Sequence, residues 1–318
     1  MKKFIGFLCI FILFHSNSFS QGCSDAGFCT MGAMKPNQRF NKKLSAHLRS
    51  IEFSQYIGVN KVGDIIMSYT TDINIGIFKR TTVQLKVPYM FCFGQLANTN
   101  GLGDLSVSAT QNLVAKEKYQ LNFTLGAKIP TNNGSKSINN RPLPNYYQSS
   151  LGTYDFVVGI SFITKKWLIA AGYQQPLNSN GNQFVWGPWN NSGSVDSAIA
   201  REYPKCRDLK RGNDIMFRIE RDFRFSRFSA NIGLLPIYRL TEDVFLDADG
   251  KRKSQPGTKG LAMTLIGGFG YNFSARSGIK FAFGYRVTQR YSAPELHELS
   301  LDGLSREFVN TIGYEFRF

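Results

Sequence analysis

After its first twenty residues, the chain lacks any uninterrupted apolar stretch near the length of about 20 residues that a membrane-spanning helix needs. This absence argues against a helical membrane protein. Histidine is scarce, with three in 318 residues, so the sequence offers few candidates for a catalytic base. It also contains no recognisable nucleic-acid-binding module, internal repeat or low-complexity run.

The first twenty residues have the composition of a secretory signal peptide. Lys2 and Lys3 form a basic start, an apolar run covers 4–14, and a small-x-small pattern precedes Gln21. This order of regions is typical of a cleaved export signal. We therefore expect residues 1–20 to be removed. Lipidation of Cys23 is an alternative, although the residues before it do not fit a lipoprotein signal.

Twelve segments of the remaining chain alternate between apolar and polar residues, which is the pattern of strands with one apolar face. Such strands are typical of a transmembrane barrel, where one face meets lipid and the other meets the lumen. The aromatic content of 14% agrees with this interpretation. The alternative is a secreted soluble β-sandwich. The predicted strands are 50–59, 65–78, 82–93, 103–114, 119–129, 152–163, 167–175, 214–223, 227–238, 260–272, 279–289 and 306–318.

The lengths of the links between these strands test the barrel independently, because outer-membrane barrels have short periplasmic turns and longer outer loops. From the second strand onward, short and long links alternate, and the first link, 60–64, must then be a short outer loop. Both termini would lie in the periplasm. The short links are 79–81, 115–118, 164–166, 224–226 and 273–278, and the long links are 94–102, 130–151, 176–213, 239–259 and 290–305.

The last strand ends on an aromatic residue. Tyr314, Phe316 and Phe318 share its apolar face. This strand resembles the C-terminal signal of Gram-negative outer-membrane β-barrels, which implies recognition by the barrel-assembly machinery and a location in the cell outer membrane. The expected fold class is therefore an all-β, transmembrane, antiparallel up-and-down barrel of about 12 strands. The expected domains are a signal peptide at 1–20, a periplasmic tail or plug at 21–49 and the barrel at 50–318.

A second resemblance concerns the stretches that lead into strands. Gly101-Leu102-Gly103-Asp104 precedes an alternating strand, and 148–156 and 283–291 are similar in style. The first of these two contains Leu151-Gly152-Thr153-Tyr154-Asp155. These stretches resemble the outer-membrane channels associated with aromatic-compound degradation, the MetA-pathway or phenol-degradation family. The resemblance implies a channel with periplasmic termini for small hydrophobic or aromatic molecules.

Basic residues outnumber acidic residues in this chain. The formal net charge is +16, and loss of the two signal lysines leaves +14. A surplus of this size indicates an anionic neighbour, which for an exported chain means lipopolysaccharide and lipid headgroups rather than nucleic acid. The alternation places charged side chains of both signs inside the barrel, where they either form a wall-stabilising network or select the solute. These lumen candidates are Glu52, Asp72, Lys86, Asp104, Lys128, Asp155, Arg218, Glu220, Lys280, Arg286, Glu315 and Arg317.

The cysteines after the signal are few. Cys23 and Cys29 are expected to form a disulfide in the oxidising periplasm. Alternatively they could join Met31 and Met34 in a soft-ligand cluster for Cu(I), although we expect no metal or cofactor. The pairing of the remaining two cysteines, Cys92 and Cys206, is left open.

The longest outer loop carries the most charge and two tryptophans. We interpret Trp186 and Trp189 as membrane-interface residues, with stacking on a ligand as the alternative. A loop of this length usually has a task such as a lid, a constriction or a binding surface, or it adheres to the anionic outer leaflet. Its charged residues are Arg201, Glu202, Lys205, Arg207, Asp208, Lys210, Arg211 and Asp214.

Three functions remain open. The first is a porin-like channel for passive transport of small molecules across the outer membrane. The alternative is a structural or adhesive barrel whose outer loops bind surface ligands. A lipid-modifying barrel enzyme is the third, but the only histidines after the signal, His47 and His297, do not lie on a strand face opposite a nucleophile. We therefore expect no enzymatic activity.

Overall fold

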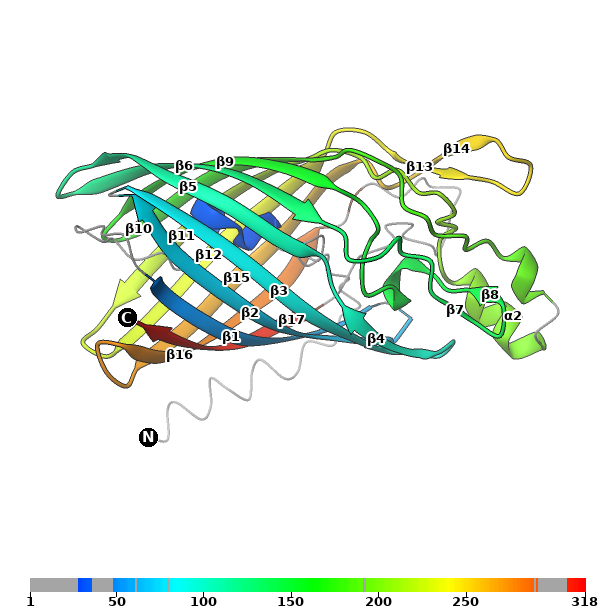
Figure 1. Ribbon diagram of the computed structural model, residues 1–318, viewed down its shortest axis with the longest axis horizontal. Coiled ribbons are helices and arrows are strands. Elements are labelled where there is room, and N and C mark those ends of the chain that lie inside the picture. Colours follow the sequence, from blue (N-terminus) through cyan, green and yellow to red (C-terminus); the bar gives the residue numbers. More distant parts are fainter. Residues whose placement is uncertain are drawn as a thin grey trace.

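The computed structural model describes residues 28–35, 48–60, 62–78, 80–190, 193–288, 290 and 308–318. Within these residues the chain forms a large antiparallel sheet that closes on itself. Figure 1 shows this barrel from the side, with the long loops at one end and the short turns at the other. The closed barrel confirms the predicted fold class. The β-sandwich alternative is wrong, because the wall strands belong to one closed sheet.

Twelve strands form the described wall, and each predicted segment overlaps one of them. The bounds agree to within a few residues. The wall strands are β1 (Leu48–Val59), β2 (Ile65–Phe78), β3 (Thr81–Phe93), β5 (Leu105–Ala115), β6 (Tyr119–Ile129), β9 (Asp155–Thr164), β10 (Trp167–Pro176), β11 (Asp214–Arg224), β12 (Phe228–Arg239), β15 (Gly260–Asn272), β16 (Ser277–Thr288) and β17 (Phe308–Arg317).

One wall strand is interrupted. A short strand, β4 (Asn98–Leu102), pairs with the outer half of β3, and β5 pairs with the other half. Between them the Gly103 N–H donates to the Pro88 carbonyl at 2.8 Å. The prediction of one strand over 103–114 therefore missed a break, since Gly103 and Asp104 leave the ladder where an outer loop approaches the wall.

The barrel closes between the first and the last strand. β17 pairs with β1 on one side and β16 on the other, with Phe53 opposite Tyr314 and Val59 opposite Phe308. The backbone N–H of Phe318 donates to the Arg49 carbonyl at 3.1 Å. The C-terminus thus lies at the end with the short turns, as the link lengths predicted (Figure 1).

The two faces of the wall have opposite chemistry. Large apolar side chains such as Phe53, Phe217 and Phe269 are more than half exposed on the outside, whereas Thr124 and Glu220 are fully buried inside. A polar interior within an apolar exterior suits a wall that stands in lipid. No helix in the described ranges is long and apolar enough to cross a membrane.

The outer loops fold into a cap, which we define as the structure formed by the loops between the strands at the long-loop end. Its buried core contains residues from β2, β3 and two long loops, 130–151 and 176–213. The buried members are Ile66, Cys92, Leu143, Tyr146, Tyr147, Phe184, Trp189, Ala200, Tyr203, Cys206 and Leu209. The cap elements are β7 (Ser137–Ile138), β8 (Arg141–Pro142), η3 (Asn145–Tyr147), η4 (Gly187–Trp189), α2 (Ser194–Arg201), β13 (Asp243–Leu246) and β14 (Arg252–Gln255).

A short segment before the first strand lies inside the barrel. It comprises η1 (Phe28–Thr30) and η2 (Gly32–Met34), drawn in dark blue within the wall in Figure 1. η2 contacts five strands: β3, β5, β6, β9 and β10. We call residues 28–35 the inner segment. The choice between a tail and a plug for 21–49 stays a prediction, since 21–27 and 36–47 lie outside the described residues, as does the expected signal peptide, while Leu48 and Arg49 belong to β1.

Candidate functional site

The inner segment is fitted to the wall by its backbone. The Gly32 N–H donates to Gln84 Oε1 at 2.7 Å, and the Ala33 N–H donates to Thr124 Oγ1 at 2.7 Å. Gly32 has a φ of +46°, a conformation that favours glycine. An added Cβ there would lie 2.5 Å from Thr110 Oγ1. Only glycine therefore allows so close an approach to the wall.

Two methionines of the inner segment occupy space that inward-facing glycines leave open. A Cβ on Gly126 would lie 2.7 Å from Met31 Sδ, and a Cβ on Gly159 would lie 2.6 Å from Met34 Sδ. Each sulfur thus packs against a different strand. This geometry favours a packing role over the shared Cu(I) site considered above. In the described part of the chain, no three His, Cys, Asp or Glu side chains gather as a metal site.

The methionines also cover an apolar patch on the inner face of the wall. This patch breaks the polar-inside rule over neighbouring strands from β9 to β15. Its buried members, which cluster with Cys29, Met31 and Met34, are Val157, Ala170, Met216, Leu235, Ile237 and Ile266. We call this set the lumen patch. A purely water-filled pore would have no need of it, since such a surface is unfavourable in water.

Lys35, the last residue of the inner segment, joins an ionic network near the short-turn end of the barrel. Its Nζ lies 3.0 Å from Glu52 Oε2 and 2.8 Å from Asp72 Oδ2. Lys280 links Glu52, at 3.2 Å, to Glu315, at 3.1 Å. Lys86 also pairs with Asp72, and Arg317 also pairs with Glu315. Six of the predicted lumen candidates therefore meet in one place, on strands that are far apart in sequence.

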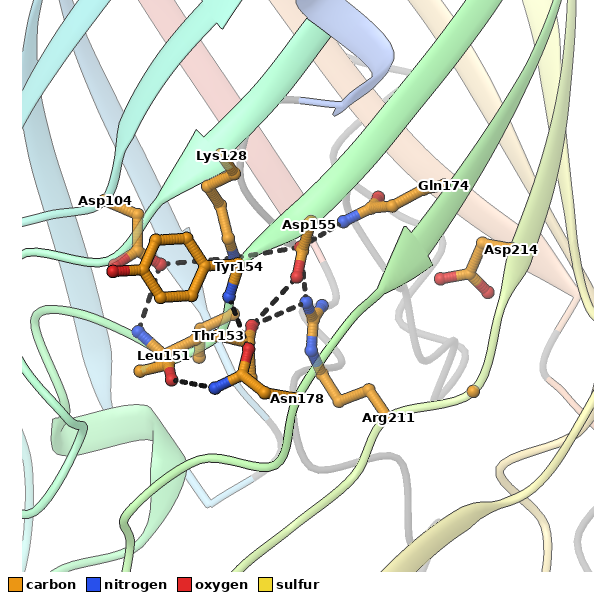
Figure 2. A network of polar contacts seen from close by, with 12 residues as sticks. Asp104, Lys128, Leu151, Thr153, Tyr154, Asp155, Gln174, Asn178, Arg211 and Asp214 are labelled. Carbon is orange, nitrogen blue, oxygen red and sulfur yellow. Dashed lines mark hydrogen bonds and ion pairs between the residues drawn. The ribbon is translucent and has the colours of Figure 1, made fainter.

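A second network surrounds Lys128 closer to the cap. Its fully buried Nζ lies 3.2 Å from carboxylate oxygens of both Asp104 and Asp155. Asp155 also accepts from Arg211, Gln174 and Thr153. Figure 2 shows how these side chains converge from several wall strands and from the longest loop. Arg211 was predicted only as one of the charged residues of the longest outer loop, and it is buried here, because its partner is an inward carboxylate.

The Lys128 network brings together two of the three stretches that suggested the channel resemblance. Asp104 ends the first stretch and accepts from the Leu151 N–H of the second at 3.1 Å. Gly152 has a φ of +73°, and a Cβ there would lie 2.4 Å from the Asn133 carbonyl oxygen. Asp104 and Gly152 are therefore required because the 130–154 loop passes close to the interrupted strand.

Arg239 holds a third buried group that sequence reasoning missed. Its guanidinium donates to both carboxylate oxygens of Asp214 at 2.9 Å, and to both of Asp243 at 2.9 and 3.0 Å. Arg290 lies 3.4 Å from Asp214. This cluster joins β11, β12 and the base of the β13–β14 hairpin. No local pattern signals it, because Arg239 and Asp243 belong to what the sequence presents as a loop.

The cap is held by a buried carboxylate, Asp64, in the link between β1 and β2. Tyr203 Oη donates to Asp64 Oδ2 at 2.7 Å and Tyr147 Oη donates to Oδ1 at 2.9 Å. Asn60 Nδ2 donates to Oδ2 at 2.7 Å. Burial, followed by the charge of Asp64, raises the pKa of both tyrosines above the usual range. We call Asp64, Tyr147 and Tyr203 the Asp64 latch, since it joins three outer links.

The other lumen candidates lie in smaller groups. Arg218 pairs with Glu220 at 3.1 Å and also donates to the Cys29 carbonyl at 3.1 Å, so it ties the inner segment to β11. Arg286 is buried on β16, where its Nε donates to the Thr288 carbonyl. The assembly-signal residues Tyr314, Phe316 and Phe318 are exposed on the outer surface. Their recognition by assembly factors stays a prediction.

The cysteines and tryptophans have definite positions. Cys29 is disulfide-bonded, while Cys23 lies outside the described residues, so the predicted pair stays a prediction. Cys92 and Cys206 are buried in the cap as thiols. The interfacial interpretation of the tryptophans is wrong: Trp189 is buried in the cap core, and Trp186 Nε1 donates to the Tyr203 carbonyl. Packing between loops outweighs the interface here.

Both remaining histidines, His47 and His297, lie outside the described residues. The enzyme alternative that depends on His297 therefore has no support from the described geometry.

Comparison with known proteins bears on the fold. No protein-family model matches the chain, and no curated protein does. Among solved structures, it is similar to an outer membrane channel from Pseudomonas putida F1, with a TM-score of 0.56 and 12% identity over 89% of this chain and 99% of the other. The chain has the fold of an outer-membrane β-barrel. A barrel of this kind, apolar outside and closed, resides in the outer membrane.

A further likeness, to the NanC porin, has a TM-score of 0.46 and 11% identity over 85% of this chain and 100% of the other. At this score it adds nothing to the argument. The first likeness shows the barrel fold.

Proposed function

We propose that this protein is an outer-membrane channel for small molecules whose lumen is closed by the inner segment. The observation that carries this proposal is that the wall does not fill its own interior. Where the inner segment sits, the wall presents glycine and small polar side chains, including Gly126, Gly159 and Thr124. A barrel of twelve strands is wider than the eight-stranded barrels that side chains alone can fill. The space is occupied instead by eight residues that precede the wall.

The lumen patch supports a solute with an apolar part. Val157, Met216 and Ile266 face the lumen and are covered by methionine side chains of the inner segment. Movement of the inner segment would expose this surface to the solute. Methionine suits a removable cover, since its flexible thioether packs on varied apolar surfaces. Small hydrophobic or aromatic molecules, as the sequence resemblance implies, would find their apolar contact here.

Displacing the inner segment tests the channel. In Gly126→Val/Gly159→Val, the new side chains take the positions of Met31 Sδ and Met34 Sδ, so the segment cannot seat. We expect single-channel conductance in planar bilayers to rise well above that of the parent protein. The matched control is Gly284→Val, an inward glycine whose nearest neighbours, Thr264 and Val309, belong to the wall.

A reversible lock provides the second arm. A Cβ on Gly159 would lie 3.0 Å from Met34 Cγ, which is within reach of a disulfide between cysteines at the two positions. Met34→Cys/Gly159→Cys should conduct little when oxidised and more after reduction, relative to the parent protein treated with the same reductant. Absence of current from the displaced variant, with its barrel folded, would refute the channel and favour the structural or adhesive alternative.

The surroundings of the barrel follow from its location. Outer-membrane lipids contact the exposed apolar belt. We further propose that lipopolysaccharide contacts the exposed basic residues of the β13–β14 hairpin, such as Lys251 and Arg252. The barrel-assembly machinery is proposed to recognise the aromatic end of β17. Salt-dependent retention of lipopolysaccharide during purification, weakened by Lys251→Gln, would test the first of these contacts.

A further inference from the structure

A cavity of about 160 Å³ opens at the short-turn end of the barrel, between the turns that follow β11 and β15. Three charged side chains line it, and all three are cations: Arg224, Lys280 and Arg317. Among the described residues, no carboxylate lines it. The carboxylates that pair with these cations, such as Glu315 and Asp222, are not among the lining residues, so the charged groups at its surface are positive.

A network of ion pairs lies behind this cavity. Four cations, Lys35, Lys86, Lys280 and Arg317, share three carboxylates of the network described above, Glu52, Asp72 and Glu315. Glu315 serves two of them at once. Arg224 adds a further cation, 3.5 Å from Asp222 and about one-third exposed. A bound anion would therefore lie beside three cations, Arg224, Lys280 and Arg317.

The rest of the lining is apolar or able to hydrogen-bond. Phe225, Phe228 and Ile279 contribute apolar surface, and Ser229 and Asn272 contribute polar groups. A volume of this size suits a molecule smaller than the occupants of typical ligand pockets of roughly 300–1,000 Å³. A fork of guanidinium donors matches a carboxylate in particular.

We propose that this cavity is a binding site for a small organic anion, a carboxylate attached to a short apolar body, at the periplasmic mouth of the barrel. Arg224 holds the carboxylate, and Lys280 and Arg317 supply charge, while Phe228 and Ile279 contact the apolar body. A role of this site in transport rests on the proposed function, and in that role it would be the last site that the solute occupies. As a binding site it stands by itself.

Binding is measured on the purified full-length protein in detergent, by calorimetry, so that no transport is needed. The probes are hexanoate, hexylamine and inorganic phosphate. Hexanoate should bind, hexylamine should not, and phosphate should bind more weakly than hexanoate because it has no apolar body. Arg224→Gln should weaken hexanoate binding about two- to fivefold, the range expected for one partly exposed charge contact.

The matched control is Arg227→Gln, an exposed arginine in the same turn that does not line the cavity. It should leave hexanoate binding unchanged. Equal binding of hexanoate and hexylamine, equal binding of phosphate and hexanoate, or equal effects of the two arginine variants would each overturn the proposal. If hexanoate binds but Gly126→Val/Gly159→Val shows no conductance, the proposed channel function is refuted and the proposed binding site is supported.

Discussion

The Asp64 latch gives the sharpest test of how the cap stays closed. Asp64 is fully buried and accepts hydrogen bonds from two tyrosines of different loops. Tyr203→Phe removes one hydroxyl and leaves Asp64 Oδ2 with the Asn60 amide. Tyr147→Phe removes more, since Tyr147 Oη also accepts from the Leu96 N–H at 3.1 Å.

The magnitude follows from the kind of bond that is lost. A hydrogen bond to a charged group contributes about 1.5–3 kcal/mol, and each 1.4 kcal/mol is about tenfold in an equilibrium. Tyr203→Phe should therefore raise the population of the open cap by roughly ten- to a hundredfold. Tyr147→Phe should exceed this, because it also leaves a backbone N–H without its acceptor. The two changes should not add, since the two hydroxyl oxygens lie 2.9 Å apart and share the Asp64 carboxylate.

Hydrogen exchange measures the effect locally. The amides of Gln95, Leu96 and Cys206, whose backbone N–H groups bond within the cap, should exchange faster in both variants, while amides of the wall strands keep their protection. Tyr154→Phe is the control, because Tyr154 is 52% exposed. Unchanged exchange in Tyr147→Phe would refute the latch, and faster exchange in wall and cap alike would mean that the tyrosines support the barrel as a whole.

Three other predictions follow from buried groups. Since the folded protein raises the pKa of Tyr147 and Tyr203 from an ordinary 10.0, their stabilising contribution is complete below pH 10 and is lost as the pH rises above it; absorbance titration should show two tyrosines ionising only with cap opening. Arg239→Met leaves Asp214 and Asp243 buried without their main partner, which should cost about 3–5 kcal/mol, seen as a lower urea midpoint; an unchanged midpoint would contradict the cluster. Burial raises the pKa of the Cys206 thiol, so maleimide should modify it only after denaturation, and rapid labelling of the folded protein would argue against a closed cap.

The sequence predicted the wall well because the wall obeys a local rule. Lipid on one side and a polar lumen on the other impose a two-residue period, and link lengths report which end each turn occupies. Lys128, Glu220 and Lys280 were placed on the inner face by this period alone. The same rule failed at Gly103 and Asp104, where the approach of the 130–154 loop interrupts the ladder.

Contacts between distant loops were outside the reach of local patterns. Tyr203 and Asp64 are 139 positions apart and meet only because the loops fold together. Trp189 was misassigned for this reason, as its partners come from other loops.

By itself, then, the sequence determined that the chain forms a barrel, which residues face inward and which end carries the long loops, because alternation and link length are properties of consecutive residues. The tertiary structure alone decided how the interior is filled. Met31 and Met34 could be matched to Gly126 and Gly159 only when strands far apart in sequence were brought around them. The physical reason is that close packing and charge pairing depend on distances in space, which a pattern of neighbours does not contain.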